Sequence, residues 1–210
     1  MRVKYPRTPH LPWSKGATKD DLCTTSTSCF VGKKVIVTEK MDGENTTLYT
    51  DYTHARSVDG RFHPSRAWVK ALQGKIGYQI PDGWRVCGEN LYAKHSIYYA
   101  NLPSYFLVFS VWNDQNYSLS WEETVCFSKQ LGLATPEVLY DGIWDETTIR
   151  NLVLDTDKQE GYVVRLAASF DYKDFAKSIA KWVRPNHVTT DKHWMHVDVT
   201  PNGLKQKEGQ

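Results

Sequence analysis

Long apolar runs are missing from this chain: no stretch approaches the roughly 20 apolar residues that a membrane-spanning helix needs. The N-terminus, MRVKYPRTPHLPW, also lacks the apolar core of a signal peptide. Paired CxxC spacing is absent among Cys23, Cys29, Cys87 and Cys126. These absences disfavour a membrane protein and a disulfide-stabilised secreted domain, and they predict a cytoplasmic protein with free thiols.

A strong excess of charge of one sign is missing as well. The chain has 26 Lys and Arg against 24 Asp and Glu, for a formal net charge of +2. The whole surface is therefore not polycationic, and a nucleic-acid interface would have to be a local patch. Aromatic residues, at 13%, indicate a folded chain rather than a disordered one. A chain of 210 residues can bury a sizeable core, in one large domain or two small ones.

Strands and helices are predicted in mixed order, without a βαβ rhythm. Ser120 and Glu123 form a capping box for one helix, and Gly132 ends that helix. Pro64 fits the first turn of another. The order favours an α+β fold with largely antiparallel sheets. Strands are expected at 33–40, 45–51, 84–93, 105–113 and 160–167, helices at 63–76, 120–132 and 145–154, and a last ordered segment at 176–184.

The most informative stretch is EKMDGEN, residues 39–45, which contains Lys-x-Asp-Gly from Lys40 to Gly43. Period two places Ile36, Thr38 and Lys40 on one face of the preceding strand, which brings the amine to a pocket wall. The glycine lets the backbone pass close to a ligand. A lysine amine is a covalent nucleophile once it is deprotonated. Taken alone, the pattern equally fits an exposed lysine beside an Asp-Gly turn.

Further features follow Lys40 in a fixed order. HARS carries Arg56, GENLYAKHSI carries Glu89, YFLVFSVWN carries Phe109, QEGYVV carries Glu160, and AKSIAKWVR carries Lys177, Lys181 and Arg184. This ordered set resembles the covalent nucleotidyltransferases, which are the ATP-dependent ligases and capping enzymes. GENLYAKHSI and EGYVV are most similar to the motifs of the phage-type RNA ligase family. The resemblance extends to about Trp194, and the full set is far more specific than any single motif.

The resemblance implies a ligase-type nucleotidyltransferase fold, similar to ATP-grasp, with antiparallel sheets flanking a nucleotide pocket. It implies an ATP-dependent RNA ligase of RNA repair that uses ATP with Mg²⁺ or Mn²⁺. Lys40 would attack the α-phosphate and form a lysyl-adenylate. The AMP would pass to an RNA 5′-phosphate, and a 3′-hydroxyl would then displace it. RNA ends are the implied partner, in a bacterial cell or a phage-infected host.

The resemblance also assigns roles, and the chemistry of each side chain suits its role. The guanidinium fork of Arg56 suits a phosphate, the flat face of Phe109 suits adenine, and the carboxylate of Glu160 suits a hard cation such as Mg²⁺. Lowering the pKa of the Lys40 amine would require a divalent cation or Lys181 nearby. The expected nucleotide-binding set is Glu39 at the adenine amino group, Lys40, Arg56, Glu89 at the ribose, Phe109, Glu160 and Lys181, with Asn45 assisting transfer to RNA.

Two features depart from the family pattern. The family commonly ends with two lysines spaced i, i+2, whereas here only Lys181 matches, so Lys177 and Arg184 are the candidates for a second cation. The 26 residues 185–210 are too few for the OB-fold domain of DNA ligases and capping enzymes. We therefore expect an adenylyltransferase domain at 1–195, with a surface segment at 1–22, and a short tail at 196–210. Complete sealing would depend on whether the N-terminal segment, the short tail, or an accessory RNA-binding partner or domain in trans grips the RNA.

Three alternatives remain open at this point. A capping guanylyltransferase or a small DNA ligase would share the lysine chemistry, and GTP in place of ATP would distinguish the capping enzyme. A non-catalytic module that binds RNA ends would keep the fold, although retention of Lys40, Glu89, Glu160 and Lys181 argues against it. His187, His193 and His196 could form a zinc site, but no cysteine lies near them in the sequence.

Overall fold

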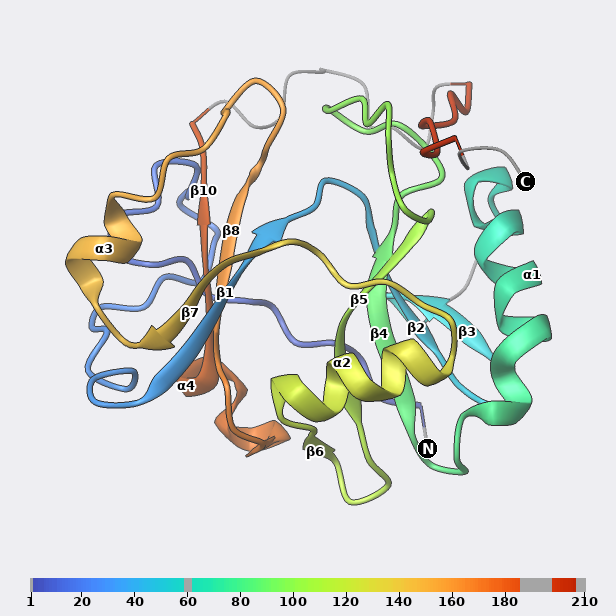
Figure 1. The fold of residues 1–210 in the computed structure, drawn as a ribbon, viewed down its shortest axis with the longest axis horizontal. Coiled ribbons are helices and arrows are strands. Elements are labelled where there is room, and N and C mark those ends of the chain that lie inside the picture. Colours follow the sequence, from blue (N-terminus) through green and yellow to red (C-terminus); the bar gives the residue numbers. More distant parts are fainter. Residues whose placement is uncertain (1, 59–61, 186–197, 207–210) are drawn as a thin grey trace.

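The computed structural model describes residues 2–58, 62–185 and 198–206. The candidate zinc ligands His187, His193 and His196 lie outside the described residues. So does the expected domain boundary between residues 195 and 196. Two antiparallel sheets form the frame, and Figure 1 shows them side by side. This arrangement confirms the expected α+β class with antiparallel sheets.

The four-stranded sheet has the order β10-β8-β1-β7. Its strands are β1 (Lys34–Lys40), β7 (Val138–Ile143), β8 (Gly161–Leu166) and β10 (Ile179–Val183). Alternation sends Val35 and Val37 to the outer face, where they pack with Leu11, Phe30 and Ile149 of helix α3 (Glu146–Arg150). The other face carries Thr38 and Lys40, as the period-two pattern predicts. Helix α3 ends at Arg150, four residues before the expected end at Leu154.

The six-stranded sheet has the order β3-β2-β4-β5-β6-β9. Helix α1 (Ala67–Ile76), which follows a 3₁₀ turn at Pro64–Arg66, and helix α2 (Trp121–Gln130) cover its outer face through a core that includes Leu48, Val69 and Val108. The predicted capping box of α2 is present. The strands are β2 (Glu44–Leu48), β3 (Thr53–Ala55), β4 (Arg85–Asn90), β5 (Phe106–Trp112), β6 (Tyr117–Ser118) and β9 (Phe170–Asp171); the short helical pieces are η2 (Gly77–Gln79), η3 (Tyr172–Asp174) and α4 (Phe175–Ser178).

The chain crosses between the sheets at the Lys-x-Asp-Gly run. Strand β1 ends at Lys40 in the four-stranded sheet, and β2 begins at Glu44 in the six-stranded sheet (Figure 1). Packing requires a glycine at position 43, because a Cβ there would lie 2.6 Å from the carbonyl oxygen of Asn90. The nucleophile candidate therefore stands at the junction of the two sheets.

The N-terminal segment does more than run over the surface. Lys181 N–H donates to the carbonyl of Pro9, and Leu11 N–H donates to the carbonyl of Lys181, so this segment covers the edge of β10. Tyr5, His10 and Leu11 are buried. Paired in this way, β10 presents no open edge along Lys181. None of the helices in the described residues has both the length and the apolar character needed to cross a membrane.

Candidate active site

A cavity of about 550 Å³ opens between the two sheets. It brings together seven residues of the expected set from five separate stretches of sequence. That all of them line the same cavity is the main structural support for an active site here. They are Glu39, Lys40, Asn45, Arg56, Glu89, Phe109 and Lys181.

Lys40 forms an ion pair with Glu160, which stands behind Lys40 and is not itself among the residues that line the cavity. Its Nζ lies 2.5 Å from Oε2 of Glu160, although the two residues are 120 positions apart in sequence. Glu160 is 7% exposed, and it directly precedes β8, whose Gly161 pairs with Lys40. The sheet register thus fixes the carboxylate beside the amine.

The Lys40 amine is held in its protonated form by this arrangement. Burial alone lowers the pKa of Lys40, but the carboxylates of Glu160 and Glu89 outweigh burial and raise the pKa above its ordinary value. The two carboxylates outweigh any lowering by Lys181, so the net pKa of Lys40 in this arrangement is raised. Burial and the charge of Lys40 instead lower the pKa of Lys181.

Glu89 lies at the inner end of β4, where a carboxyl group is costly to ionise. Burial raises the pKa of Glu89 to about 8; Lys40 opposes this rise, and Glu160 and Asp42 add to it. The backbone N–H of Gly43 donates to the Glu89 carboxyl group, which ties β4 to the loop after Lys40. Near neutral pH this group is therefore largely protonated.

We expect Glu89→Gln to stabilise the ligand-free protein at alkaline pH. The folded-state pKa of about 8 exceeds the ordinary value of 4.5, so the free energy of unfolding falls as pH rises between these values. Urea unfolding should show the variant about 2–4 kcal/mol more stable than wild type near pH 9, and within about 1 kcal/mol near pH 5. Glu122→Gln, at an exposed position of α2, is the matched control and should show no such divergence. The same difference in unfolding free energy between Glu89→Gln and wild type at both pH values would contradict the raised pKa of Glu89.

Aromatic and acidic groups of the kind that suit adenine line the cavity. Phe109 projects from β5, and the ring of Tyr5 meets it edge-on with centroids 5.1 Å apart. Val163 of β8 lines the same cavity, so an apolar face and a flat ring are both available to a purine. Burial raises the pKa of Glu39; a hydrogen bond from Gln159 opposes the rise, and the charge of Glu137 adds to it.

Cationic groups line the cavity from both sheets. Lys181 projects from β10, and Arg56 follows β3 with an exposed side chain. Lys177 is exposed, lies 4.0 Å from Asp174 and does not line this cavity. Arg184 is also absent from the lining, although its N–H donates to the carbonyl of Glu160. The second cation proposed from the sequence is therefore not supplied to the cavity wall by either candidate.

Arg165 is a cavity residue that the sequence reasoning missed. It is 5% exposed, and its guanidinium donates to the carbonyl of Phe109 and, at 3.3 Å, to Oγ1 of Thr38. No carboxylate pairs with it among the described residues, and burial lowers its pKa. Because it stands two residues after Val163 in EGYVVRL, strand periodicity could have placed it on the cavity face.

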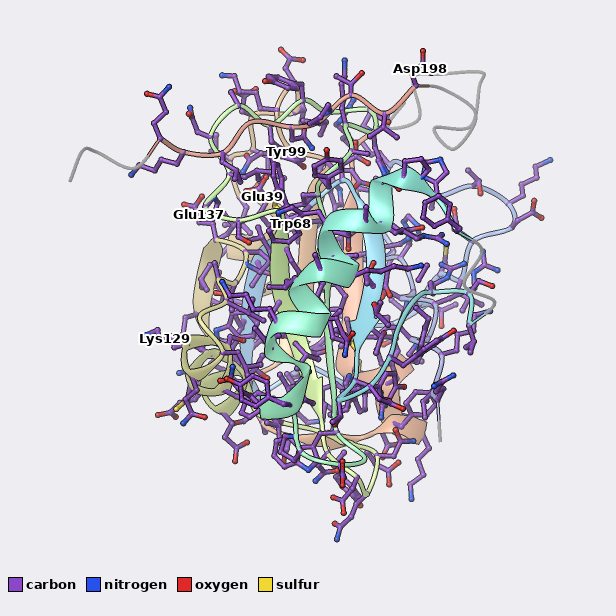
Figure 2. The ribbon with its side chains drawn as sticks, turned by 90° about the vertical axis from the view of Figure 1, so that its right-hand side faces the viewer. Glu39, Trp68, Tyr99, Lys129, Glu137 and Asp198 are labelled. Carbon is purple, nitrogen blue, oxygen red and sulfur yellow. The ribbon has the colours of Figure 1, made fainter. Side chains whose placement is uncertain are left out.

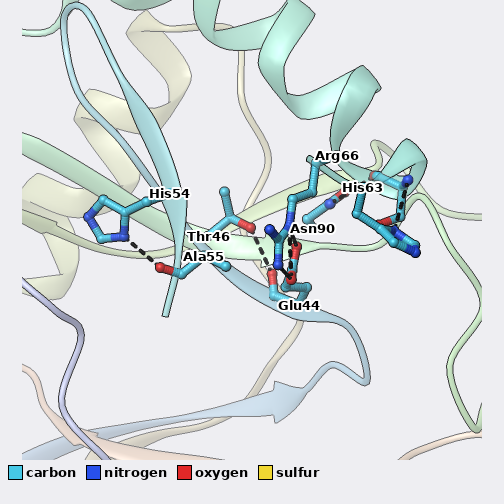
Figure 3. Close-up of polar contacts among 8 residues, drawn as sticks. Glu44, Thr46, His54, Ala55, His63, Arg66 and Asn90 are labelled. Carbon is cyan, nitrogen blue, oxygen red and sulfur yellow. Dashed lines mark hydrogen bonds and ion pairs between the residues drawn. The ribbon is translucent and has the colours of Figure 1, made fainter. Parts of the chain in front are cut away.

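Glu44 and Arg66 form a second buried ion pair at the cavity margin, shown in Figure 3. Nε of Arg66 lies 2.8 Å from Oε2 of Glu44, and Nη2 contacts Oε1. Asn90 adds a hydrogen bond from Nδ2 to the carbonyl of Ser65 at 3.1 Å. These contacts fasten the turn before α1 to the start of β2.

Tyr5, contributed by the N-terminal segment, is a second cavity residue that the sequence reasoning missed. No local pattern marks a residue whose role depends on distant packing.

The donor set fits a cation that is shared with a substrate rather than caged by protein. No cluster of three or more His, Cys, Asp or Glu able to hold a metal occurs in the described residues. Glu160 and Glu89 nevertheless place two carboxyl groups near Lys40. Magnesium typically takes one or two carboxylates and completes its shell with waters and substrate phosphates. The carboxyl groups therefore suit Mg²⁺ or Mn²⁺, and Glu160 is the ligand that the sequence leads us to expect.

The fold is shared with solved ligases. The chain is similar to an archaeal ATP-dependent RNA ligase (TM-score 0.56, 17% identity, 86% of this chain and 48% of that chain). It is also similar to a mutant Naegleria gruberi RNA ligase solved with ATP and Mn (0.52, 18%, 75% and 52%) and to a putative ATP-dependent DNA ligase from Aquifex aeolicus (0.54, 20%, 86% and 50%). The chain thus spans about half the length of each. At these identities the likeness shows the fold.

The family follows from the sequence itself. A search of curated proteins gave no significant match. The RNA ligase family model, in contrast, matches residues 33–183, which is well over half of the 210 residues and runs from the start of β1 to the end of β10. This chain therefore belongs to the RNA ligase family.

Proposed function

We propose that this protein is an ATP-dependent RNA ligase that forms a lysyl-adenylate at Lys40 and joins RNA 5′-phosphate to 3′-hydroxyl ends. The observation that carries the proposal is the ion pair between Lys40 and Glu160, at 2.5 Å, in which Lys40 lines a cavity that also holds Phe109. A half-buried amine beside carboxylates, a flat aromatic face and several cationic side chains match the needs of nucleotidyl transfer.

The protein would hold the nucleoside through side chains already in place. Phe109 and Val163 offer the apolar surfaces for adenine, and Glu39 offers a carboxyl group for its amino edge. Glu89, protonated to a large extent at neutral pH, can both donate to and accept from ribose hydroxyl groups. The fit of base and ribose orients the α-phosphate toward Lys40.

The nucleophile must lose a proton before it attacks. The ligand-free site favours the ammonium form, because Glu160 and Glu89 raise the pKa of Lys40. A bound divalent cation supplies positive charge that competes for these carboxylates and offsets the charge of the phosphates. The ammonium of Lys40 would pass its proton to solvent water, and the neutral amine would then form a P–N bond to the α-phosphorus. The bond to the β-phosphate breaks with its electron pair leaving on pyrophosphate, and the extra proton on the new P–N nitrogen also passes to water. Lys181 stands where it can neutralise the developing charge.

Transfer to RNA would use the outer part of the cavity. Arg56 is exposed there and suits a terminal 5′-phosphate through its forked donors. Asn45 lies nearby on β2, and its buried Oδ1 has no hydrogen-bond partner among the described residues. Such an atom stays costly until a ligand donates to it. The 5′-phosphate would attack the lysyl-adenylate, and the 3′-hydroxyl would then displace AMP.

A strand-joining assay tests this function. Purified protein is incubated with ATP, Mg²⁺ and 5′-³²P-labelled RNA, offered as single strands and as nicks in duplex, and products are separated on denaturing gels. We expect an adenylylated 5′ end and a joined product from RNA with ATP. Matched DNA strands and GTP test the DNA ligase and capping alternatives. Joining of DNA in preference to RNA, or use of GTP in place of ATP, would overturn the proposal.

A further inference from the structure

Asp42, two residues after the nucleophile candidate, is anchored by a distant loop rather than by its own strand. Its Oδ2 accepts hydrogen bonds from the backbone N–H groups of Ser96 and Ile97, both at 2.8 Å. Its own N–H donates to the hydroxyl of Tyr99 at 2.9 Å. Three contacts from residues 96–99 therefore fix the backbone that follows Lys40.

Residues 198–206, which we name the clasp, hold that loop in turn. Figure 1 shows the clasp in red beside the green loop of residues 91–105, and Figure 2 shows Tyr99 and Asp198 toward the same end of the molecule. Isolated bridges join Ala93 to Pro201 and Leu102 to Leu204. The clasp is thus built into the fold, at a position expected from the sequence to be a short tail.

Asn202 is the central residue of the clasp. It is 3% exposed, and its Oδ1 accepts from the N–H of Tyr99 at 3.0 Å. Its Nδ2 donates to the carbonyl of Leu91 at 2.8 Å, and its N–H donates to the carbonyl of Tyr92 at 2.9 Å. Both ends of the amide are therefore used on one loop.

The backbone around Asn202 closes onto the same loop. Gly203 N–H donates to the carbonyl of Tyr99 at 2.7 Å, and the carbonyl of Gly203 accepts from Leu102 at 2.9 Å. A Cβ on Gly203 would lie 2.4 Å from the carbonyl oxygen of Ala100, so only glycine permits this approach. The hydroxyl of Tyr105 donates to the carbonyl of Asn202 at 2.9 Å. These hydrogen bonds and this close backbone approach hold the loop of residues 91–105 in one geometry, as expected of a segment that supports an active site.

We infer that the clasp positions the nucleophile, with Asn202 as a positioning residue that acts through Tyr99 and Asp42 on Lys40. Tyr99 is the link, because its N–H is held by Asn202 while its hydroxyl receives the N–H of Asp42. The inference rests on the proposed function of Lys40 as nucleophile. Its consequence is that loss of the clasp slows attack on ATP without altering the residues that hold the nucleotide.

The test compares Asn202→Ala, Tyr99→Phe and the double variant with a matched control, Lys205→Ala. Lys205 has an exposed side chain, and only its backbone N–H bonds to the loop. Lysyl-adenylate formation is measured at several ATP concentrations. We expect each single variant to slow the rate at saturating ATP about 10- to 100-fold, as misplacement of a reacting group does, with KM changed no more than about threefold. The double variant should be no slower than about the slower single variant, because both act along one path.

Hydrogen–deuterium exchange gives a second readout that needs no activity. In Asn202→Ala, the amides of residues 42, 96 and 97 should exchange faster than in wild type, while α1 and α2 keep their protection. Lys205→Ala should match wild type in both assays. Wild-type rates and unchanged exchange in Asn202→Ala, or additive losses in the double variant, would overturn the positioning role. If wild type forms no lysyl-adenylate, the proposed function fails, and exchange alone decides whether the clasp fixes Asp42.

Discussion

Glu160→Gln is expected to slow lysyl-adenylate formation about 100- to 1000-fold near neutral pH, the scale of losing one preorganised electrostatic group. The substitution keeps the size of the side chain but removes its charge. Two consequences oppose each other. The Lys40 amine loses the carboxylate that lies 2.5 Å away, so its proton is released more easily. The site also loses the carboxylate that would bind the divalent cation, and this loss dominates because the phosphates then lack compensation.

The two consequences can be measured separately. Competitive acylation of the ligand-free protein across a pH series reports the pKa of Lys40, which should be lower in Glu160→Gln than in wild type. Quench-flow with α-labelled ATP reports the rate. Glu146→Gln serves as control, since Glu146 lies on α3 and pairs with Arg150. An unchanged pKa of Lys40 in Glu160→Gln would show that the ion pair does not govern the protonation of the amine.

Lys181→Ala is expected to slow the same step by about 100- to 1000-fold, while Lys177→Ala changes it by less than about threefold. Lys181 lies on the cavity face of β10, and burial and Lys40 lower its pKa. Lys177, four residues earlier, is exposed and 4.0 Å from Asp174. Both variants replace a lysine by alanine, one on the cavity face and one outside it, so their comparison isolates the effect of position.

The measurement is the rate of adenylylation at saturating ATP for the Lys181→Ala and Lys177→Ala variants. Circular dichroism should show both variants folded, because neither side chain belongs to the core clusters. Lys181→Arg should restore part of the rate, since charge is kept while geometry changes. If Lys177→Ala lost as much adenylylation rate as Lys181→Ala, Lys177 of α4 would have to contact the phosphates as well, which would contradict this prediction.

Local patterns in the sequence predicted much of the frame. Period two placed Thr38 and Lys40 on the inner face of β1, and the capping box at Ser120 marked the start of α2. Strand β7 escaped prediction because it is an edge strand without a buried residue and contains an Asp-Gly pair, which is typical of a turn. Edge strands show little alternation, so periodicity does not reveal them.

The site itself depends on contacts between distant residues. Lys40 and Glu160 are 120 positions apart, and Tyr99 and Asn202 are 103 apart. The first pair could be anticipated only through resemblance to a family, and the second had no signal in the sequence. The direction of the Lys40 pKa also needed the structure, because it depends on how near Glu160 and Glu89 lie. The division at residue 195 stays a prediction.

Mapping the site of adenylylation tests the central claim most directly. The protein is incubated with α-labelled ATP and Mg²⁺, digested, and sequenced by mass spectrometry under conditions that preserve phosphoramidates, with Lys40→Ala and Lys181→Ala in parallel. We predict AMP on Lys40 in wild type, none in Lys40→Ala, and a slow but correctly placed adduct in Lys181→Ala. AMP on another residue, or labelling that survives Lys40→Ala, would contradict the account.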